Sequence, residues 1–202
     1  IEIALEQKGL EDEMINTPLE TVHASIDRIS NITQQMRRLV HEKEVQSDFH
    51  DINETVKSLV SLYSQRISNS QITLEENYSS ESVIVHCDRH KIEQVLFNIL
   101  NNALYALEKK VGERELNITV EPNGKEVFIS IENNGPMIPK ETQSHVFSPF
   151  FSDKPVGEGT GLGLSICHNI IKYHEGELNF TSNEKATCFT IQLNLEKVQK
   201  AG

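Results

Sequence analysis

The chain has 202 residues, of which 37% are hydrophobic and 24% are charged. These proportions are typical of a globular protein with one or two domains. Thirty acidic against nineteen basic residues give a formal net charge of −11, which argues against binding to nucleic acids or anionic membranes. A phosphate site remains open, since such a site can use backbone N–H groups and a few local cations.

No apolar run reaches the roughly 18 residues that a membrane span needs, and no signal peptide opens the chain. Cys87, Cys167 and Cys188 are far apart and lack the spacing of a zinc site. We therefore expect reduced thiols, a cytoplasmic location and no membrane contact in this part of the protein. Because the chain begins at Ile1 rather than Met, we expect a fragment of a longer protein.

Residues 17–44 are predicted to form one long helix, in which Thr17 is the N-cap and Pro18 is the first helical residue. Apolar or small side chains then recur at alternating spacings of three and four: Leu19, Val22, Ile26, Ile29, Thr33, Met36 and Val40. This spacing is typical of a coiled coil or helical bundle, so we expect a homodimer joined by a four-helix bundle. The alternative is a helix that packs on its own domain.

After a polar joint at 43–51, hydrophobic periodicity predicts three helices and six strands. The helices are expected at 52–68, 88–109 and 162–173, and the strands at 72–76, 83–87, 116–120, 127–133, 178–182 and 188–195. Helices mixed with antiparallel strands indicate an α+β sandwich with helices on one face of a sheet. We expect this domain over residues 49–197, after a helical region at 1–48 and before a tail at 198–202.

Two asparagines share one face of the helix predicted at 88–109. Asn98 and Asn102 are four residues apart on an otherwise apolar helix. Buried carboxamides are costly unless they have partners, and their oxygens are hard ligands that suit Mg²⁺. The alternative is a pair of asparagines on the helix surface.

A further asparagine ends an apolar strand. Val127, Ile129 and Ile131 alternate to one face, and Asn133 continues the alternation, so its side chain is expected to point toward the interior. A polar group there, just before Gly135, can read the edge of a bound base. The alternative is the start of a turn, which Asn-Gly-Pro also indicates.

Glycines at 157, 159, 161 and 163 lead into the helix at 162–173. They allow close backbone approach and aim the first N–H groups of that helix at an anion. The motif is neither a Walker A loop nor a Rossmann fingerprint. Phe147, Phe150 and Phe151 precede it and are expected to anchor a mobile lid over 136–160, from which Lys154 can reach a phosphate.

The motifs occur in one order: Asn-xxx-Asn-Ala at 98–103, Asn-Asn-Gly-Pro at 133–136, Phe-Ser-Pro-Phe-Phe at 147–151 and Gly-Thr-Gly-Leu-Gly-Leu at 159–164. This set resembles the ATP-binding domain of sensor histidine kinases, in the GHKL family shared with gyrase, Hsp90 and MutL. The resemblance covers residues 52–195 and implies a GHKL-type α/β sandwich with a mixed, largely antiparallel sheet. The helix at 17–44 resembles the second helix of the dimerisation and histidine-phosphotransfer hairpin.

The resemblance also implies a role for each motif residue. Asn102 is the implied Mg²⁺ ligand. Lys91 and Asn98 are the implied catalytic residues: Lys91 faces the phosphates, and Asn98 positions a water or the acceptor. Asn133 stands where the family usually has an Asp that receives the adenine amino group, and Met137 replaces a glycine, so we expect weakened rather than abolished ATP binding. The other implied nucleotide-binding residues are Gly135, Ile138, Phe147, Phe151, Lys154, Gly159, Thr160, Gly161, Leu162, Gly163 and Leu164.

The implied activity is phosphoryl transfer from Mg-ATP to a histidine, and then to an aspartate of a response regulator. The family phosphorylates a histidine on the first bundle helix, whereas His23 and His41 lie on the second and lack the motif. We therefore expect the phosphoacceptor upstream of this chain, which by itself would not autophosphorylate. Two alternatives remain: a nucleotide-poor regulatory module that binds a response regulator or another kinase, and a GHKL ATPase outside two-component signalling.

Overall fold

The computed structural model describes residues 47–155 and 159–195. The predicted bundle helix with His23 and His41, the glycine at 157 and the C-terminal tail lie outside the described residues. The chain divides into two units, and the larger one contains the described residues 47–151 and 161–195. Residues 152–155 and 159–160 belong to the other unit and are described by themselves.

The larger unit is built on a five-stranded sheet with the strand order β2-β4-β5-β7-β6. The strands are β2 (Ile72–Tyr78), β4 (Arg114–Asn123), β5 (Glu126–Asn133), β6 (Glu177–Ser182) and β7 (Thr187–Asn194). Strand β2 pairs parallel with β4, and all other pairs in this sheet are antiparallel. The predicted mixed, largely antiparallel sheet is therefore confirmed.

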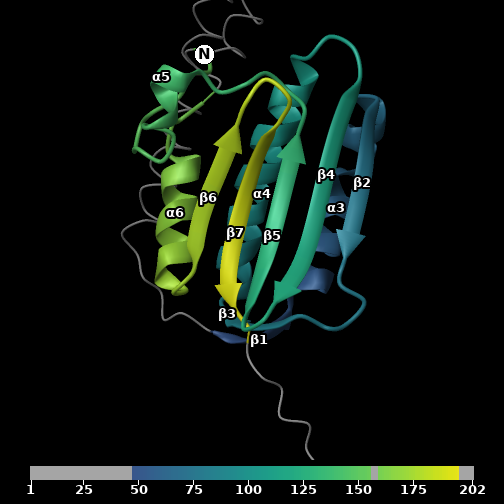
Figure 1. Ribbon diagram of the computed structural model, residues 1–202, viewed down its shortest axis with the longest axis vertical. Coiled ribbons are helices and arrows are strands. Elements are labelled where there is room, and N and C mark those ends of the chain that lie inside the picture. The colour runs from purple at the N-terminus through teal and green to yellow at the C-terminus, as the bar shows by residue number, and fades with distance from the viewer. Residues whose placement is uncertain (1–46, 156–158, 196–202) are drawn as a thin grey trace, which may run out of the picture. The chain divides into compact units, whose positions relative to one another are not determined.

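Three helices accompany this sheet: α3 (Ile52–Asn69), α4 (Arg89–Glu108) and α6 (Gly163–Tyr173). Figure 1 shows α3 and α4 behind the sheet, and α6 packs against α4 and β6. The predicted α+β sandwich is confirmed, with bounds within two residues of those expected for the helices. Asp51 and Asp88 cap α3 and α4 by accepting hydrogen bonds from the N–H groups of Asn53 (2.9 Å) and Lys91 (3.2 Å).

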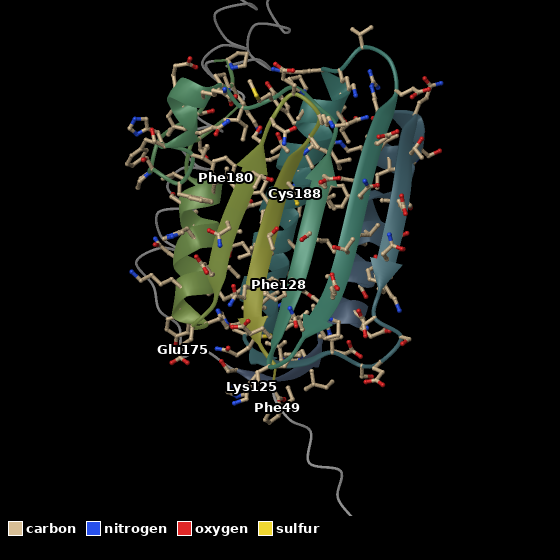
Figure 2. All side chains as sticks on the ribbon, in the orientation of Figure 1. Phe49, Lys125, Phe128, Glu175, Phe180 and Cys188 are labelled. Atoms are coloured by element: carbon tan, nitrogen blue, oxygen red, sulfur yellow. The ribbon has the colours of Figure 1, made fainter. Side chains whose placement is uncertain are left out.

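The strands alternate as their sequences predict. In β5, Val127, Ile129 and Ile131 are buried against the helices, whereas the residues between them are half-buried on the other face. Figure 2 shows Phe128 of β5 and Cys188 of β7 on the face of the sheet that bears no helix. The core therefore lies between the sheet and the helices, and α4, with eight buried apolar residues, is its centre.

Two elements were not predicted. Strand β1 (Asp48–Asp51) lies in the polar segment that was interpreted as a joint, and it pairs antiparallel with β3 (Ile84–Cys87) in a separate two-stranded sheet. Its own sequence has no apolar alternation that could predict a strand. Backbone pairing with β3 holds it in place. Helix α5 (Lys140–Gln143) is a single turn after Pro139, too short to show helical periodicity.

Candidate functional site

A stripe of three residues along one face of α4 lies between two of the predicted motifs, the glycine motif and the loop after β5. Asn98, Asn102 and Ala106 follow one another at intervals of four residues, so they lie on the same face about one turn apart. At one end, the Asn98 Nδ2 donates to the carbonyl of Gly163, the first residue of α6, at 3.4 Å. At the other end, a Cβ on Gly135 would lie 2.9 Å from the Cβ of Ala106. Asn102 therefore lies between the glycine motif and the loop that follows β5.

The carboxamide of Asn98 is used within the protein. Besides Gly163, its Nδ2 contacts the Cys167 Sγ at 3.6 Å, so it joins α4 to the first turn of α6. Burial raises the pKa of the Cys167 thiol to about 12, and the hydrogen bond from Asn98 opposes this rise only in part. The thiol is therefore neutral near pH 7 and serves as a packing group rather than a nucleophile.

Asn133 points into the interior, as its place in the alternation of β5 predicts, and its side chain is only 3% exposed. Its Oδ1 accepts a hydrogen bond from the Gly135 N–H at 3.0 Å, and its Nδ2 donates to the carbonyl of Thr187 at 3.3 Å. One partner is a donor and the other an acceptor, so the carboxamide has a single satisfactory orientation.

Two residues of this region were missed in the sequence. Thr187, at the start of β7, is 4% exposed, and its hydroxyl lies 2.6 Å from the hydroxyl of Ser182. The Ser182 Oγ also accepts from the Ile138 N–H at 2.9 Å. The signal was present for Thr187, since it continues the alternation of Phe189 and Ile191 as a polar residue on a buried face.

The first part of the predicted lid is attached to the domain. The Gln143 Nε2 donates to the carbonyls of Ile138 (2.9 Å) and Ser182 (3.2 Å). Phe147 packs edge-on against Phe180 of β6, with ring centroids 5.6 Å apart. These contacts hold the chain from Ile138 to Phe147 against the domain.

Other residues of the predicted lid also have defined surroundings. Phe147 also packs against His168 of α6, and Phe151 packs against His145, with centroids 5.3 and 6.2 Å apart. Met137 is half-buried and lies in the loop between Gly135 and Ile138. Phe147 and Phe151 therefore make ring contacts within the protein, whereas Phe150 is exposed.

Gly161 of the glycine motif packs closely against the backbone of Phe150. Gly161 and Phe150 both have a left-handed backbone, with φ of 67° and 65°, and a Cβ on Gly161 would overlap the backbone of Phe150. Only glycine fits such a close approach. Leu162 follows and is 1% exposed, Leu164 is half-buried, and α6 begins between them at Gly163.

The predicted cations lie on different units. Lys91 is half-buried in the first turn of α4, seven residues before Asn98 and hence on the same face. Lys154, Gly159 and Thr160 belong to the smaller unit, in which a Cβ on Gly159 would lie 2.5 Å from the Oγ of Ser152 and 3.2 Å from the Cδ of Lys154. This close approach accounts for a glycine at 159.

No helix within residues 47–155 and 159–195 is long and apolar enough to cross a membrane. The same residues contain no group of three or more His, Cys, Asp or Glu side chains arranged to hold a metal ion.

The chain matches the family described as histidine kinase-, DNA gyrase B-, and HSP90-like ATPase over residues 87–197. The sensory histidine kinase/phosphatase NtrB of Salmonella typhimurium is 31% identical over 199 residues, which cover 94% of this chain and 55% of NtrB. Sporulation kinase C of Bacillus subtilis is 28% identical over 179 residues, which cover 88% of this chain and 41% of that kinase. The chain thus spans about half the length of these curated relatives.

Solved structures of histidine kinases are similar to this chain as well. The nucleotide-free catalytic domain of histidine kinase ThkA is 33% identical with a TM-score of 0.66, over 74% of this chain and 95% of that one. Histidine kinase ThkA in complex with response regulator protein TrrA is 26% identical with a TM-score of 0.75, over 98% of this chain and 57% of that one. The chain therefore belongs to the family of histidine kinase-, DNA gyrase B- and HSP90-like ATPases, and its ATP-binding domain is that of a sensor histidine kinase.

Proposed function

We propose that this domain binds Mg-ATP along the stripe of α4 and, within the longer protein, transfers the γ-phosphoryl group to a histidine upstream of this chain. The phosphoryl group would then pass to an aspartate of a response regulator. The observation that carries the proposal is the placement of Asn102 between Gly163 of the glycine motif and Gly135 of the loop after β5. A nucleotide-poor regulatory module would not need this arrangement, whereas a GHKL ATPase outside two-component signalling would share it and is separated by the phosphorylation test below.

The base would lie at the end of the stripe near Ala106. There Asn133 offers hydrogen-bonding groups, and Gly135 lets the loop backbone lie directly against Ala106. Met137 and Ile138 are proposed to line this end, and Leu162 and Leu164, which flank Gly163, are proposed to wall the pocket toward the glycine motif.

Phosphates would lie at the end near Gly163, because the first turn of a helix leaves N–H groups without helical acceptors and carries a partial positive charge. Lys91 shares this face of α4, and the family resemblance also implies Lys154, Gly159 and Thr160 as nucleotide-binding residues. Asn102 would hold Mg²⁺ through its Oδ1, and the bound ion would neutralise charge on the phosphates.

Asn98 is proposed as a positioning residue rather than a catalytic one. Its Nδ2 is hydrogen-bonded to Gly163 and contacts Cys167, so it sets the distance between α4 and the start of α6. The protein's contribution to phosphoryl transfer would then be mainly positioning and electrostatic, because the acceptor nitrogen is itself the nucleophile.

The proposed partners are a second copy of the chain and the receiver domain of a response regulator. The spacing of the apolar residues at 17–44 supports the dimer. The complex of ThkA with TrrA supports a response regulator as the partner of a related kinase. We place the activity in the cytoplasm, since it would consume ATP and the three cysteines are free thiols.

A titration with a fluorescent ATP analogue, with and without Mg²⁺, tests the proposal. Asn102→Ala should weaken Mg²⁺-dependent binding by more than about tenfold, since a carboxamide ligand is lost. Asn169→Ala is the matched control, because Asn169 is exposed on α6. Absence of binding by the wild-type chain at millimolar nucleotide would overturn the proposal. The longer protein should also acquire acid-labile phosphate on a histidine, which a GHKL ATPase outside two-component signalling would not.

A further inference from the structure

The hydrogen bonds of Asn133 bear on which purine base the site accepts. A carboxamide oxygen has two acceptor positions, and its nitrogen carries two hydrogens. In this structure Oδ1 uses one position on the Gly135 N–H, and Nδ2 uses one hydrogen on the Thr187 carbonyl. One acceptor and one donor of the same side chain therefore remain for a ligand.

The orientation of this carboxamide is held from both sides. Rotating it by 180° would set Nδ2 against the Gly135 N–H and Oδ1 against the Thr187 carbonyl, so both hydrogen bonds would be lost. Thr187 is itself fixed, since it is paired with Asn133 across β5 and β7 and its hydroxyl is bonded to Ser182. Because Asn133 is 3% exposed, water does not compensate for such a loss.

A carboxylate at this position would behave differently. It offers acceptors only, so it favours a 6-amino purine and repels the oxygen of a 6-oxo purine. The carboxamide of Asn133 can accept a hydrogen bond from a 6-amino group through Oδ1 or donate one to a 6-oxo group through Nδ2.

We propose that Asn133 makes the base site tolerant at purine C6, so that the domain binds 6-oxopurine nucleotides as well as adenine nucleotides. The inference rests on the proposed function, in which the base lies beside Asn133. Its physical basis is that a site rejects a ligand strongly only when the ligand leaves a buried polar group unpaired, and here either base finds a partner.

Competition by ATP, ITP and GTP against a fluorescent nucleotide, with Mg²⁺ present, tests this inference through binding alone. ITP is the principal probe because it changes the C6 edge without the 2-amino group of GTP. For the wild-type chain we expect ITP and ATP to bind within about tenfold of each other. For Asn133→Asp we expect the preference for ATP to rise by at least about tenfold, because the carboxylate repels the 6-oxo group.

The matched control is Asn134→Asp, the same change one residue later. Asn134 is bonded to the backbone of Glu113 and Glu115 and lies outside the proposed base site, so its ATP/ITP ratio should equal that of the wild type. Thermal melting of each variant establishes that it is folded. If Asn133→Asp does not fold, Asn133→Ala replaces it and should weaken both nucleotides equally.

The outcomes separate the two proposals. Binding of ATP together with rejection of ITP by about a hundredfold or more would overturn the tolerance at C6 and leave the proposed function standing. An unchanged ratio in a folded Asn133→Asp variant would also overturn it. Failure of every nucleotide to bind would overturn the proposed function as well.

Discussion

Gly135 lies so close to Ala106 that a Cβ on the glycine would be 2.9 Å from the Cβ of the alanine and 2.8 Å from the Oδ1 of Asn133. The loop after β5 therefore rests directly on α4, and the same close approach holds the Asn133 carboxamide. A helix and a loop that meet without an intervening side chain leave little room for adjustment. Gly135 thus couples the position of the proposed base site to the stripe that carries Asn102.

Gly135→Ala is expected to lower the free energy of unfolding by about 1–3 kcal/mol through overpacking. Nucleotide affinity should fall as well, because Asn133 is displaced. Urea denaturation measures the first effect. Adding Ala106→Gly removes one of the two clashes, so the double variant should be more stable than the sum of the single losses predicts. A Gly135→Ala chain as stable as the wild type would contradict the close packing of this loop.

Asn98→Ala removes the donor that bonds the Gly163 carbonyl and contacts the Cys167 Sγ. We expect a loss of about 1 kcal/mol in the free energy of unfolding, together with weaker nucleotide binding, because α6 is less firmly held to α4. Denaturation and titration of the same variant measure the two effects. Weaker binding with unchanged stability would instead indicate that Asn98 touches the nucleotide directly, and the positioning role would be wrong.

The ion pair of Arg66 and Glu108 gives stability a dependence on pH. The Arg66 Nε and Nη2 donate to the two carboxylate oxygens of Glu108 at 2.8 and 2.9 Å, and these bonds lower the pKa of that carboxyl. A lowered pKa means that the pair stabilises the folded state above the ordinary glutamate pKa of about 4.3. Its contribution is lost as the pH falls through the lowered value.

Glu108→Gln should therefore cost up to about 1 kcal/mol at neutral pH, a small value because both side chains are about one-third exposed. The cost should disappear in strongly acidic solution, where the wild-type carboxyl is protonated. Chemical denaturation across this pH range measures it. Glu93→Gln is the control, since Glu93 pairs with Arg89 on a single helix. A difference that grew on acidification would have the wrong sign.

The three cysteines are expected to differ in reactivity. Burial raises the pKa of the Cys87 thiol to about 11 and that of Cys167 to about 12, and both side chains are fully buried. Cys188 also has a raised pKa because of burial, but it is half-buried on the face of the sheet without helices. Alkylation should therefore modify Cys188 first and the other two only when the domain opens. Mass spectrometry of labelled peptides measures the order, and early labelling of Cys167 would contradict it.

The local pattern of apolar and polar residues was sufficient to predict most helices and strands of the fold. The alternating spacing of three and four residues in α4 and the period of two in β5 arise because one side of each element packs into the core, so both are visible in the sequence. For the same reason the inward direction of Asn133 was predictable. The strand β1 was not, because its pairing with β3 depends on residues more than thirty positions away rather than on its own side chains.

The features of the candidate site also divide into those set by local sequence and those set by tertiary contacts. The sequence by itself determined that Asn98 and Asn102 share a helix face, that Asn133 ends a buried strand and that glycines lead into α6, because these depend on neighbours within one element. Only the tertiary structure decided that Asn98 is bonded to Gly163, that Asn133 is bonded to Thr187 and that Gly135 rests on Ala106. Those contacts join residues 29 to 65 positions apart, and such partners are chosen by strand register and helix packing, which no local pattern encodes.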